Sequence, residues 1–474
     1  MSFLQENKGG EIMLTGYLKY NDINHSFVFD ENKKELQLIP IEAERIVSSV
    51  TIITNDLPKM NTPFLIGTIN ENHHRIVFIT IQGASIKRVN NILYIRLYAY
   101  FLYNSIKTEL IDKLTFCSPE IDHIFSVNRA FSFVFKDVKD FNRNGTVTIE
   151  TNDFDSTTSQ TQSFTVAGKN VNVSFQISRT ISTKIGKPPL ALQSCLCFEF
   201  EATDDYSFII NLCHYARNFI RYLCFRKNIF FTSVDIYKPV EETKHLNIGE
   251  ICFFDSGDKP EIEPLSTSRC IKYEYIAGCE GKILSDIVSN SLYLRHLPKT
   301  FEDGKHIDVS SFIMITAAFE WEFSRNYPKG IIKSDSTIKA EDAVSDAIND
   351  LLSKSTGKQK NIYKFLLRLV KSDSMQSEII QFGKDYSDII GVFGEHLYSL
   401  NHVIFDYKEI GKRVSDQRNH FAHGDLDKDF INEALLDVIF MEYIVYTLQL
   451  KAFGLTTDNI RKSINDVFHL NFAL

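Results

Sequence analysis

The chain has 474 residues, of which 44% are hydrophobic and 24% charged, so it is a globular protein too long for one ordinary core. Its formal net charge of −8 excludes a protein that binds nucleic acid through a surface that is basic as a whole. Any contact with RNA must therefore come from a local basic patch.

The cysteines and the apolar runs bear on the compartment. The 8 cysteines form no Cys-x-x-Cys pair and mostly lie in apolar segments, which indicates buried, reduced thiols. The first residues show no signal-peptide pattern, and no apolar run reaches the length that spans a membrane. We therefore expect a cytoplasmic protein with no membrane partner.

The front of the chain, up to about residue 235, has the pattern of antiparallel strands. Short β-branched and aromatic runs recur between turn residues, with few helical stretches among them. Ala167-Gly168-Lys169-Asn170 predicts a hairpin turn. One helix, Asp204–Lys227, is expected to pack on the sheet. The predicted strands are Glu11–Leu18, His25–Asp30, Glu35–Ile39, Arg45–Ile53, Pro63–Ile69, Arg75–Gln82, Asn91–Tyr103, Ile124–Phe135, Thr146–Glu150, Ser163–Val166, Val171–Ile177 and Cys195–Glu201.

A change of pattern marks the domain boundary. Between about Ile236 and Gly278 the pattern is mixed, with a strand near Glu250–Asp255 and a further short element at Cys270–Ile276. We place the boundary at about residue 275. The prediction is an α+β multidomain protein, with a β-rich, antiparallel, sandwich-like or barrel-like domain over 1–275 and an all-α domain over 276–474.

The second domain is helical to its end. Helical periodicity recurs from residue 282 onward and is interrupted by turn residues such as Pro328. The predicted helices are Lys282–Leu294, Ser310–Arg325, Ile338–Leu352, Asn361–Val370, Ser377–Ser399, Tyr407–Ala422, Lys428–Ala452 and Asp458–Phe468.

The stretch Ser415–Asp425, which reads S-D-Q-R-N-H-F-A-H-G-D, carries the clearest chemistry. Arg418 keeps its charge at any physiological pH and offers a fork of donors to phosphate oxygens. His423 can accept or donate a proton near neutrality. Gly424 is typical of a helix C-cap, so His423 is expected in the last helical turn, where the dipole favours its protonated form.

The sequence leaves other readings of this stretch open. Arg418 can instead form a surface ion pair with Asp416 or Asp425, and His423 can simply cap the helix. Positions five apart lie about 140° apart on a helix, so the two side chains do not share one face. They can converge at the helix end, or two protomers can combine their motifs. His420 and His423 with Asp425 imitate metal ligands but lack a well-placed third group, so we expect no metal and no cofactor.

The Arg418, Asn419 and His423 pattern, with four residues between arginine and histidine at the end of a helix, resembles the signature of the HEPN superfamily. The resemblance implies an all-α domain with ribonuclease activity and paired sites across a homodimer. It also implies that Glu320, in A-A-F-E-W-E-F, is the acidic residue directed at the motif arginine, although Glu320 can instead be an exposed carboxylate. Asn419 is then expected to orient its neighbours or bind a phosphate, or it is a plain polar helix position, and His420 can join the site or be solvated.

The order of the two domains makes the resemblance more specific. A β-rich front followed by this helical domain resembles the ApeA-like HEPN family of bacterial anti-phage proteins. Gly16-Tyr17-Leu18 and Leu65-Ile66-Gly67-Thr68 are further features of the resemblance. It implies abortive-infection defence, with the front domain sensing a phage-derived trigger.

A local basic patch is present at Lys360, Lys364, Arg368 and Lys371, which share one stripe of a predicted helix. Ile362, Phe365, Leu366 and Leu369 occupy the opposite face. The stripe can follow an RNA backbone, or it can be a solvated helix face.

Three hypotheses of function remain. The first is a metal-independent endoribonuclease, in which His423 acts in acid–base catalysis and Arg418 stabilises charge on phosphorus. The second is a non-catalytic module that binds RNA, a nucleotide or a protein partner, with the front domain as a recognition domain. The third is a carbohydrate- or protein-binding sandwich with a helical dimerisation tail. We also expect a homodimer, or a larger even-numbered oligomer, because Leu435–Leu450 is apolar around most of its circumference and must be covered, by a partner or by the core of its own bundle.

Overall fold

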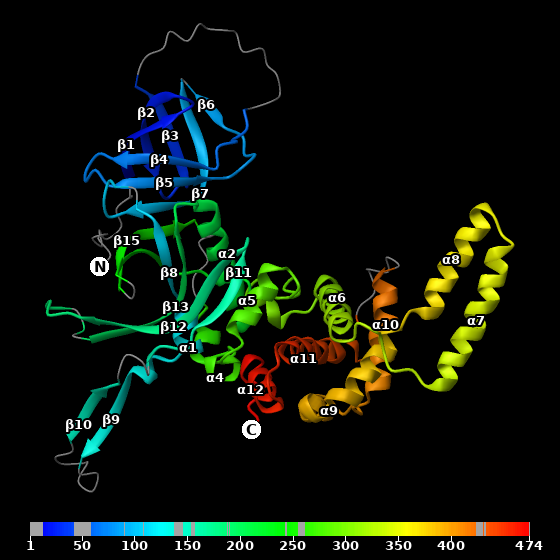
Figure 1. Cartoon of the computed structure of the whole chain (residues 1–474). Helices are drawn as coiled ribbons and strands as arrows, with labels where there is room; N and C mark the ends of the chain where they lie inside the picture. Colours follow the sequence, from blue (N-terminus) through cyan, green and yellow to red (C-terminus); the bar gives the residue numbers. More distant parts are fainter. Residues whose placement is uncertain are drawn as a thin grey trace. The chain divides into compact units, whose positions relative to one another are not determined.

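The computed structural model describes residues 13–41, 58–89, 91–107, 109–136, 146–152, 157–186, 188, 190–241, 244–254, 261–422, 430 and 433–473. The chain divides into two compact units (Figure 1). The first comprises residues 1–220, 228–260 and 280–288, and the second comprises 221–227, 261–279 and 289–474. The predicted boundary at about residue 275 lies within the stretch where the chain passes back and forth between the units.

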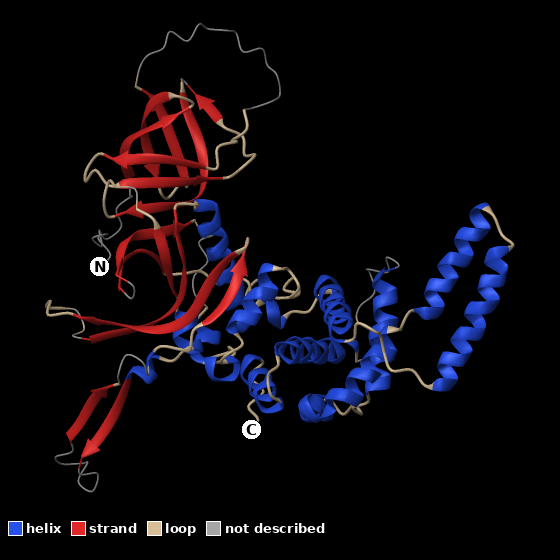
Figure 2. Ribbon diagram, in the orientation of Figure 1, coloured by secondary structure: helices blue, strands red, loops and turns tan. Residues whose placement is uncertain are grey.

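The first unit is built on an antiparallel sheet. Its main sheet has the strand order β11-β12-β13-β8-β14-β15-β7-β3-β2-β1-β4-β5, with β6 also paired to β7, while β9 and β10 form a separate hairpin (Figure 2). The strands are β1 (Met13–Tyr20), β2 (Ile23–Asp30), β3 (Glu35–Pro40), β4 (Phe64–Ile69), β5 (Arg75–Thr80), β6 (Lys87–Val89), β7 (Ile92–Tyr103), β8 (Ile111–Cys117), β9 (Phe131–Lys136), β10 (Thr146–Thr151), β11 (Gln162–Val166), β12 (Lys169–Ile181), β13 (Leu190–Thr203), β14 (Ser233–Glu241) and β15 (Lys244–Phe253).

The first part of this sheet closes into a barrel. The long strand β7 pairs with β3 over its first half and with both β5 and β15 over its second half. Because β5 returns to β7, the strands β7, β3, β2, β1, β4 and β5 form a closed ring around buried side chains such as Phe27, Phe78 and Leu97. The antiparallel, β-rich front is confirmed, and of the two predicted forms, sandwich-like and barrel-like, this part of the sheet takes the barrel-like one.

The two short front motifs are neighbours in this barrel. Leu18 of β1 pairs with Gly67 of β4, and Gly16 pairs with Ile69. A Cβ atom on Gly16 would lie 2.5 Å from the ring of Phe27, and one on Gly67 would lie 2.9 Å from the same ring. Both glycines therefore leave room for Phe27 inside the barrel, which gives the two motifs a packing role.

Several strand predictions need correction. Ile124–Phe135 is mostly not a strand, because Ser118 caps a short helix α1 (Pro119–Ile124) and the strand begins only at Phe131. Strands β8 and β14 were missed. Near Cys270–Ile276 the chain instead forms a short helix, α4 (Tyr273–Ile276). The predicted strand Arg45–Ile53 lies outside the described residues.

The predicted hairpin turn and mid-chain helix are confirmed. Ala167 and Gly168 have φ values of 48° and 81° between β11 and β12, as a tight turn with two left-handed residues requires. The helix is α2 (Tyr206–Leu223), and the first unit also contains α5 (Glu280–Val288). The predicted helix Lys282–Leu294 therefore ends earlier than expected, just before Asn290 with its φ of 55°.

The described residues of the second unit form helices and no strand. The all-helical character predicted for the second half is therefore confirmed for these residues, and most predicted helix ends agree to within a few positions. The helices are α3 (Ile262–Ser266), α4, α6 (Val309–Asn326), α7 (Asp335–Ser353), α8 (Gly357–Lys371), α9 (Met375–Leu400), α10 (Tyr407–Ala422), α11 (Ala434–Phe453) and α12 (Thr457–Val467).

Helix α11 is the centre of this unit. It packs against α6, α9, α10 and α12, and residues such as Phe440, Ile444 and Leu448 have no exposed surface. Apart from Leu435, which is 44% exposed, the apolar circumference of Leu435–Leu450 is thus covered by helices of the same chain. It therefore gives no reason to expect a partner, which corrects the argument from this helix. Among the described helices, none is both long enough and apolar enough to cross a membrane.

Candidate functional site

Helix α10 carries Arg418 and is fixed along one face. Ile410, Val414, Gln417 and Phe421 follow helical spacing and are all buried. A Cβ atom on Gly411 would lie 3.0 Å from the Cα atom of Gln376, so α10 and α9 approach closely at this glycine. Arg418 lies next to the buried face and not on it.

The carboxyl end of α10 is held by aromatic rings. The ring of Phe421 lies 5.4 Å from Phe312 of α6 and 5.6 Å from Phe430, in edge-to-face contacts. The helix is therefore anchored three residues beyond Arg418. His423, Gly424 and Asp425 lie outside the described residues, so the predicted position of His423 in the last turn stays a prediction.

A buried ion pair fixes the middle of α10. Arg413 donates two hydrogen bonds of 2.7 Å to the carboxylate of Asp437 on α11, and Tyr398 of α9 donates another of 2.6 Å. Asp437 has no exposed surface. Burial raises the pKa of Asp437, while the Arg413 guanidinium opposes this shift. The bidentate pair therefore locks three helices together, five residues before Arg418.

Arg418 itself reaches a carboxylate on another helix. Its Nη2 atom donates a 2.9 Å hydrogen bond to Oε2 of Glu320 on α6. The two side chains are 43% and 38% exposed, so the pair faces solvent. Burial raises the pKa of Glu320, and the positive charge of Arg418 lowers it in part. The sequence prediction that Glu320 is directed at the motif arginine thus agrees with the observed contact.

A second carboxylate lies within electrostatic reach of this pair. Burial raises the pKa of Glu378, on the first turn of α9, to about 7, and the nearby negative charges of Glu320 and Asp373 add to the shift. Arg418 acts in the opposite direction. Glu378 therefore changes its charge near neutral pH beside an exposed arginine, which is a property of functional sites.

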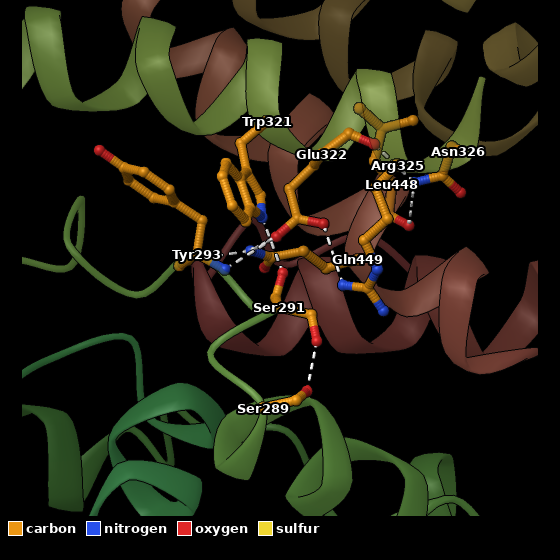
Figure 3. A network of polar contacts seen from close by, with 9 residues as sticks. All are labelled: Ser289, Ser291, Tyr293, Trp321, Glu322, Arg325, Asn326, Leu448 and Gln449. Carbon is orange, nitrogen blue, oxygen red and sulfur yellow. Dashed lines mark hydrogen bonds and ion pairs between the residues drawn. The ribbon is translucent and has the colours of Figure 1, made fainter. Parts of the chain in front are cut away.

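Helix α6 holds its two glutamates on different sides. Two positions after Glu320, the buried Glu322 accepts hydrogen bonds from the Tyr293 backbone (2.9 Å), Gln449 (3.1 Å) and Arg325 (3.2 Å), as Figure 3 shows. The indole N–H of Trp321 donates a 2.7 Å hydrogen bond to the carbonyl oxygen of Ser291. This network ties α6 to α11. Because positions two apart differ by about 200° on a helix, Glu320 is left facing α10.

The remaining predicted site residues on α10 lie on other sides of the helix. Asn419 is exposed and His420 is half-buried. Each residue turns the helix by about 100°, so neither shares the direction in which Arg418 meets Glu320. The described structure thus brings Arg418 and Glu320 together, with Glu378 nearby, and leaves Asn419 and His420 apart from them.

The predicted basic stripe lies on a different element. Lys360, Lys364 and Arg368 are exposed along α8, one helical turn apart. Lys371 ends the helix, and its side chain lies outside the description. The opposite, apolar face of α8 is also exposed, which the sequence did not predict.

Within the described ranges, His, Cys, Asp and Glu form no group of three or more that could hold a metal ion.

Comparisons with protein-family models, with curated proteins and with solved structures find no significant match.

Two carboxylates that contact or lie near arginines of α10 were not identified from the sequence. Asp437 lies in an otherwise apolar run, where a buried charge requires a partner, and that was a usable signal for the Arg413 pair. Glu378 gave no such signal. It follows the N-cap Ser374, and an acidic residue in a first helical turn is ordinary there because of the helix dipole.

Proposed function

We propose that the protein is a metal-independent endoribonuclease whose catalytic pair is Arg418 and His423, in a helical domain of the HEPN type. The single observation that carries the proposal is Arg418 itself. It is half-exposed at the end of an anchored helix, five residues before a histidine, and its guanidinium is held by Glu320 at 2.9 Å. Arg413 on the same helix gives the contrast, because its guanidinium is paired with the buried Asp437.

The proposed reaction uses the 2′-hydroxyl of RNA as its nucleophile. His423 accepts the proton of this hydroxyl, and the 2′-oxygen attacks the adjacent phosphorus. The bond from phosphorus to the 5′-oxygen breaks, and this oxygen takes up a proton. The products are a 2′,3′-cyclic phosphate and a 5′-hydroxyl.

Arg418 supports this reaction by binding the phosphate. Its guanidinium stabilises the charge that develops on the non-bridging oxygens. One donor is engaged by Glu320, which leaves the others for phosphate. Glu320 is thus a positioning residue that holds the fork of donors in one orientation.

The basic stripe of α8 is the proposed path for the RNA backbone. Lys360, Lys364 and Arg368 are exposed, and the structure records no ion pair for these side chains within the described residues. Cations that are not neutralised within the chain remain available to phosphates. The acidic composition as a whole then limits RNA binding to this surface.

The biological role follows from the resemblance. We place the enzyme in abortive-infection defence against phage, with the barrel-containing first unit as the part that senses a phage-derived trigger. The alternative is a HEPN-type domain that binds RNA, a nucleotide or a protein partner without cutting. A binding module has no need of a titrating group beside a fixed cation, which favours the enzyme.

The test is cleavage of mixed RNA by the purified full chain in EDTA, with analysis of the product ends. The proposal expects fragments that carry 2′,3′-cyclic phosphates, and an RNA with 2′-deoxy sugars that stays intact. Binding without cleavage would support the alternative. Cleavage that EDTA abolishes and magnesium restores would remove the proposed mechanism.

A further inference from the structure

Helices α7 and α8 form a hairpin that extends from the other helices of the second unit (Figure 1). Its base is closed by charged groups. Lys333 pairs with Glu341 at 2.9 Å and with Asp373 at 3.0 Å, and Asp373 also accepts a 2.9 Å hydrogen bond from the backbone of Ile331. The residues before α7 and after α8 are therefore tied together, so the hairpin is a defined element.

The contact between the two helices uses one position per turn. The less exposed residues of α7 and of α8 follow each other at spacings of three and four, as a helix-helix seam requires. They are Glu341, Ser345, Ile348 and Leu352 on α7, and Tyr363, Leu367 and Val370 on α8. Within α7, whose residues are all described, only Ser345 is buried.

Each of these seam residues is preceded by an exposed apolar residue. Residues one position before the seam lie on the same side of both helices, because the helices run antiparallel. They are Ala340, Val344, Ala347 and Leu351 on α7, and Ile362, Leu366 and Leu369 on α8, with Phe365 beside them. The large side chains among these are between 38% and 58% exposed. We call this surface the apolar face of the hairpin.

The opposite side of the hairpin is charged. The residues that follow the seam positions include Asp342 and Asp346 on α7, and Lys364 and Arg368 on α8. Along their whole length the two helices carry net charges of opposite sign. Helix α7 carries Asp335, Glu341, Asp342, Asp346 and Asp350 against Lys339, and α8 carries Lys358, Lys360, Lys364, Arg368 and Lys371 with no acidic residue.

A bare apolar face of this kind is unusual on a soluble chain. In proteins most of the stability of a helix comes from the packing of its apolar face, and exposed apolar patches mark sites of interaction. The apolar face holds no charged residue, so it does not suit RNA. The acidic side of α7 is also unfavourable near an anionic lipid surface.

We propose that the apolar face binds the apolar face of a second copy of this chain. Two antiparallel helices with one apolar face are half of a four-helix bundle, and a second copy supplies the same half. A two-fold interface requires a surface that is complementary to itself. Apolar side chains meet this requirement, and the opposite charges of α7 and α8 meet it as well.

The charges also select the arrangement. A two-fold axis parallel to the hairpin sets α7 of one copy against α8 of the other, acidic helix on basic helix. The alternative, α7 on α7, would oppose like charges. Asp350 and Lys358 both lie near the hairpin tip, toward the outer edges of their helices. In the proposed dimer each Asp350 faces Lys358 of the second copy.

This inference stands apart from the proposed chemistry, because the oligomeric state can be measured without any RNA. It also leaves the charged side of the hairpin open to RNA. The axis brings the bases of both hairpins to one end, which is the condition for two Arg418 motifs to share a cleft.

The test uses matched substitutions on each helix of the full chain. Val344→Glu and Ile362→Glu place a charge on the apolar face, and Asn349→Glu and Asn361→Glu place the same charge on exposed positions away from it. All these side chains are exposed or on the surface, so circular dichroism should report an unchanged fold. Sedimentation at micromolar concentration reports the oligomeric state.

We expect the wild type and the two Asn variants to be dimers, and the two apolar-face variants to be monomers. A wild type that is monomeric would overturn the proposal, as would apolar-face variants that remain dimers. A monomeric wild type that cosediments with phosphatidylglycerol vesicles through this face would assign the face to a lipid surface instead.

A charge exchange tests the arrangement within the dimer. Asp350→Lys alone and Lys358→Asp alone oppose like charges and should each weaken the dimer. A mixture of the two variants restores both pairs, so mixed dimers should form in preference to either homodimer. If the mixture dimerises as weakly as each variant alone, the α7-on-α8 arrangement is overturned.

Discussion

Arg418 and Glu320, 98 positions apart in the chain, meet through a 2.9 Å hydrogen bond between helices α10 and α6. Five residues earlier on the same helix, Arg413 is enclosed with Asp437. One arginine thus stabilises the helical unit, and the other is presented to solvent by a single carboxylate.

The first prediction separates these two arginines by stability. Arg413→Ala leaves the carboxylate of Asp437 buried without its cation, so the free energy of unfolding should fall by about 3–5 kcal/mol. Arg418→Ala removes a solvent-facing pair and should cost no more than about 1 kcal/mol. Urea denaturation of the two variants measures both. Equal losses would show that the two arginines do not differ in role.

The second prediction concerns Glu320. In Glu320→Gln the side chain can still accept a hydrogen bond from Arg418, but it no longer attracts the guanidinium by its negative charge. We expect the turnover number for RNA cleavage to fall about 10- to 100-fold, with KM little changed, because the arginine is less well oriented. Glu409→Gln, at an exposed position of α10, is the control and should keep full activity. A change confined to KM would make Glu320 a binding residue only.

The third prediction follows from the pKa of about 7 at Glu378. The folded-state pKa is raised above the unfolded value of 4.5, so this group favours folding below about pH 4.5. Its contribution is lost as the pH rises through 7. Glutamine does not titrate, so Glu378→Gln removes this loss. At pH 8 the free energy of unfolding of the variant should exceed that of the wild type by roughly 1–2 kcal/mol, a figure reduced because solvent screens this partly exposed group.

Thermal unfolding of both proteins from pH 5 to pH 8 checks the third prediction. The difference between variant and wild type should grow with pH across this range. A difference that is constant with pH would mean that Glu378 does not titrate there. Glu395→Gln, at an exposed position of the same helix, is the matched control.

The fourth prediction concerns the basic stripe of α8. Replacing Lys360, Lys364 and Arg368 by Gln should raise KM for RNA and reduce its dependence on salt, by about 0.7 in log–log slope for each phosphate contact removed. Turnover at saturating RNA should stay the same. Lys339→Gln on α7 is the control. An unchanged salt dependence would leave the stripe as a solvated helix face.

Local patterns predicted much of the helical unit, because its elements are long and strongly periodic. The range Tyr407–Ala422 of α10 was predicted residue for residue. Strand β8 was missed because both of its pairing partners, β13 and β14, are distant in sequence, and the barrel closure depends on β5 returning to β7. No local pattern encodes such contacts.

The candidate site was predictable only in part. Arg418 was identified from the spacing of its motif, and Glu320 from the resemblance to the HEPN superfamily. Glu378 joins them through tertiary packing alone, as its position in the first turn of α9 has an ordinary local explanation. The sequence placed the apolar residues of α8 opposite the basic stripe but did not show how exposed they are, and Phe365 and Leu369 are about half exposed.

The most direct test of the account is single-turnover cleavage of one defined RNA in EDTA by the wild type, Arg418→Ala and His423→Ala. The account predicts that the wild type cuts and leaves a 2′,3′-cyclic phosphate. It also predicts that each variant keeps its fold and loses at least about 100-fold in rate. A folded variant that cuts at the wild-type rate would contradict the assignment of its residue, and a wild type that cuts only with added magnesium would contradict the mechanism.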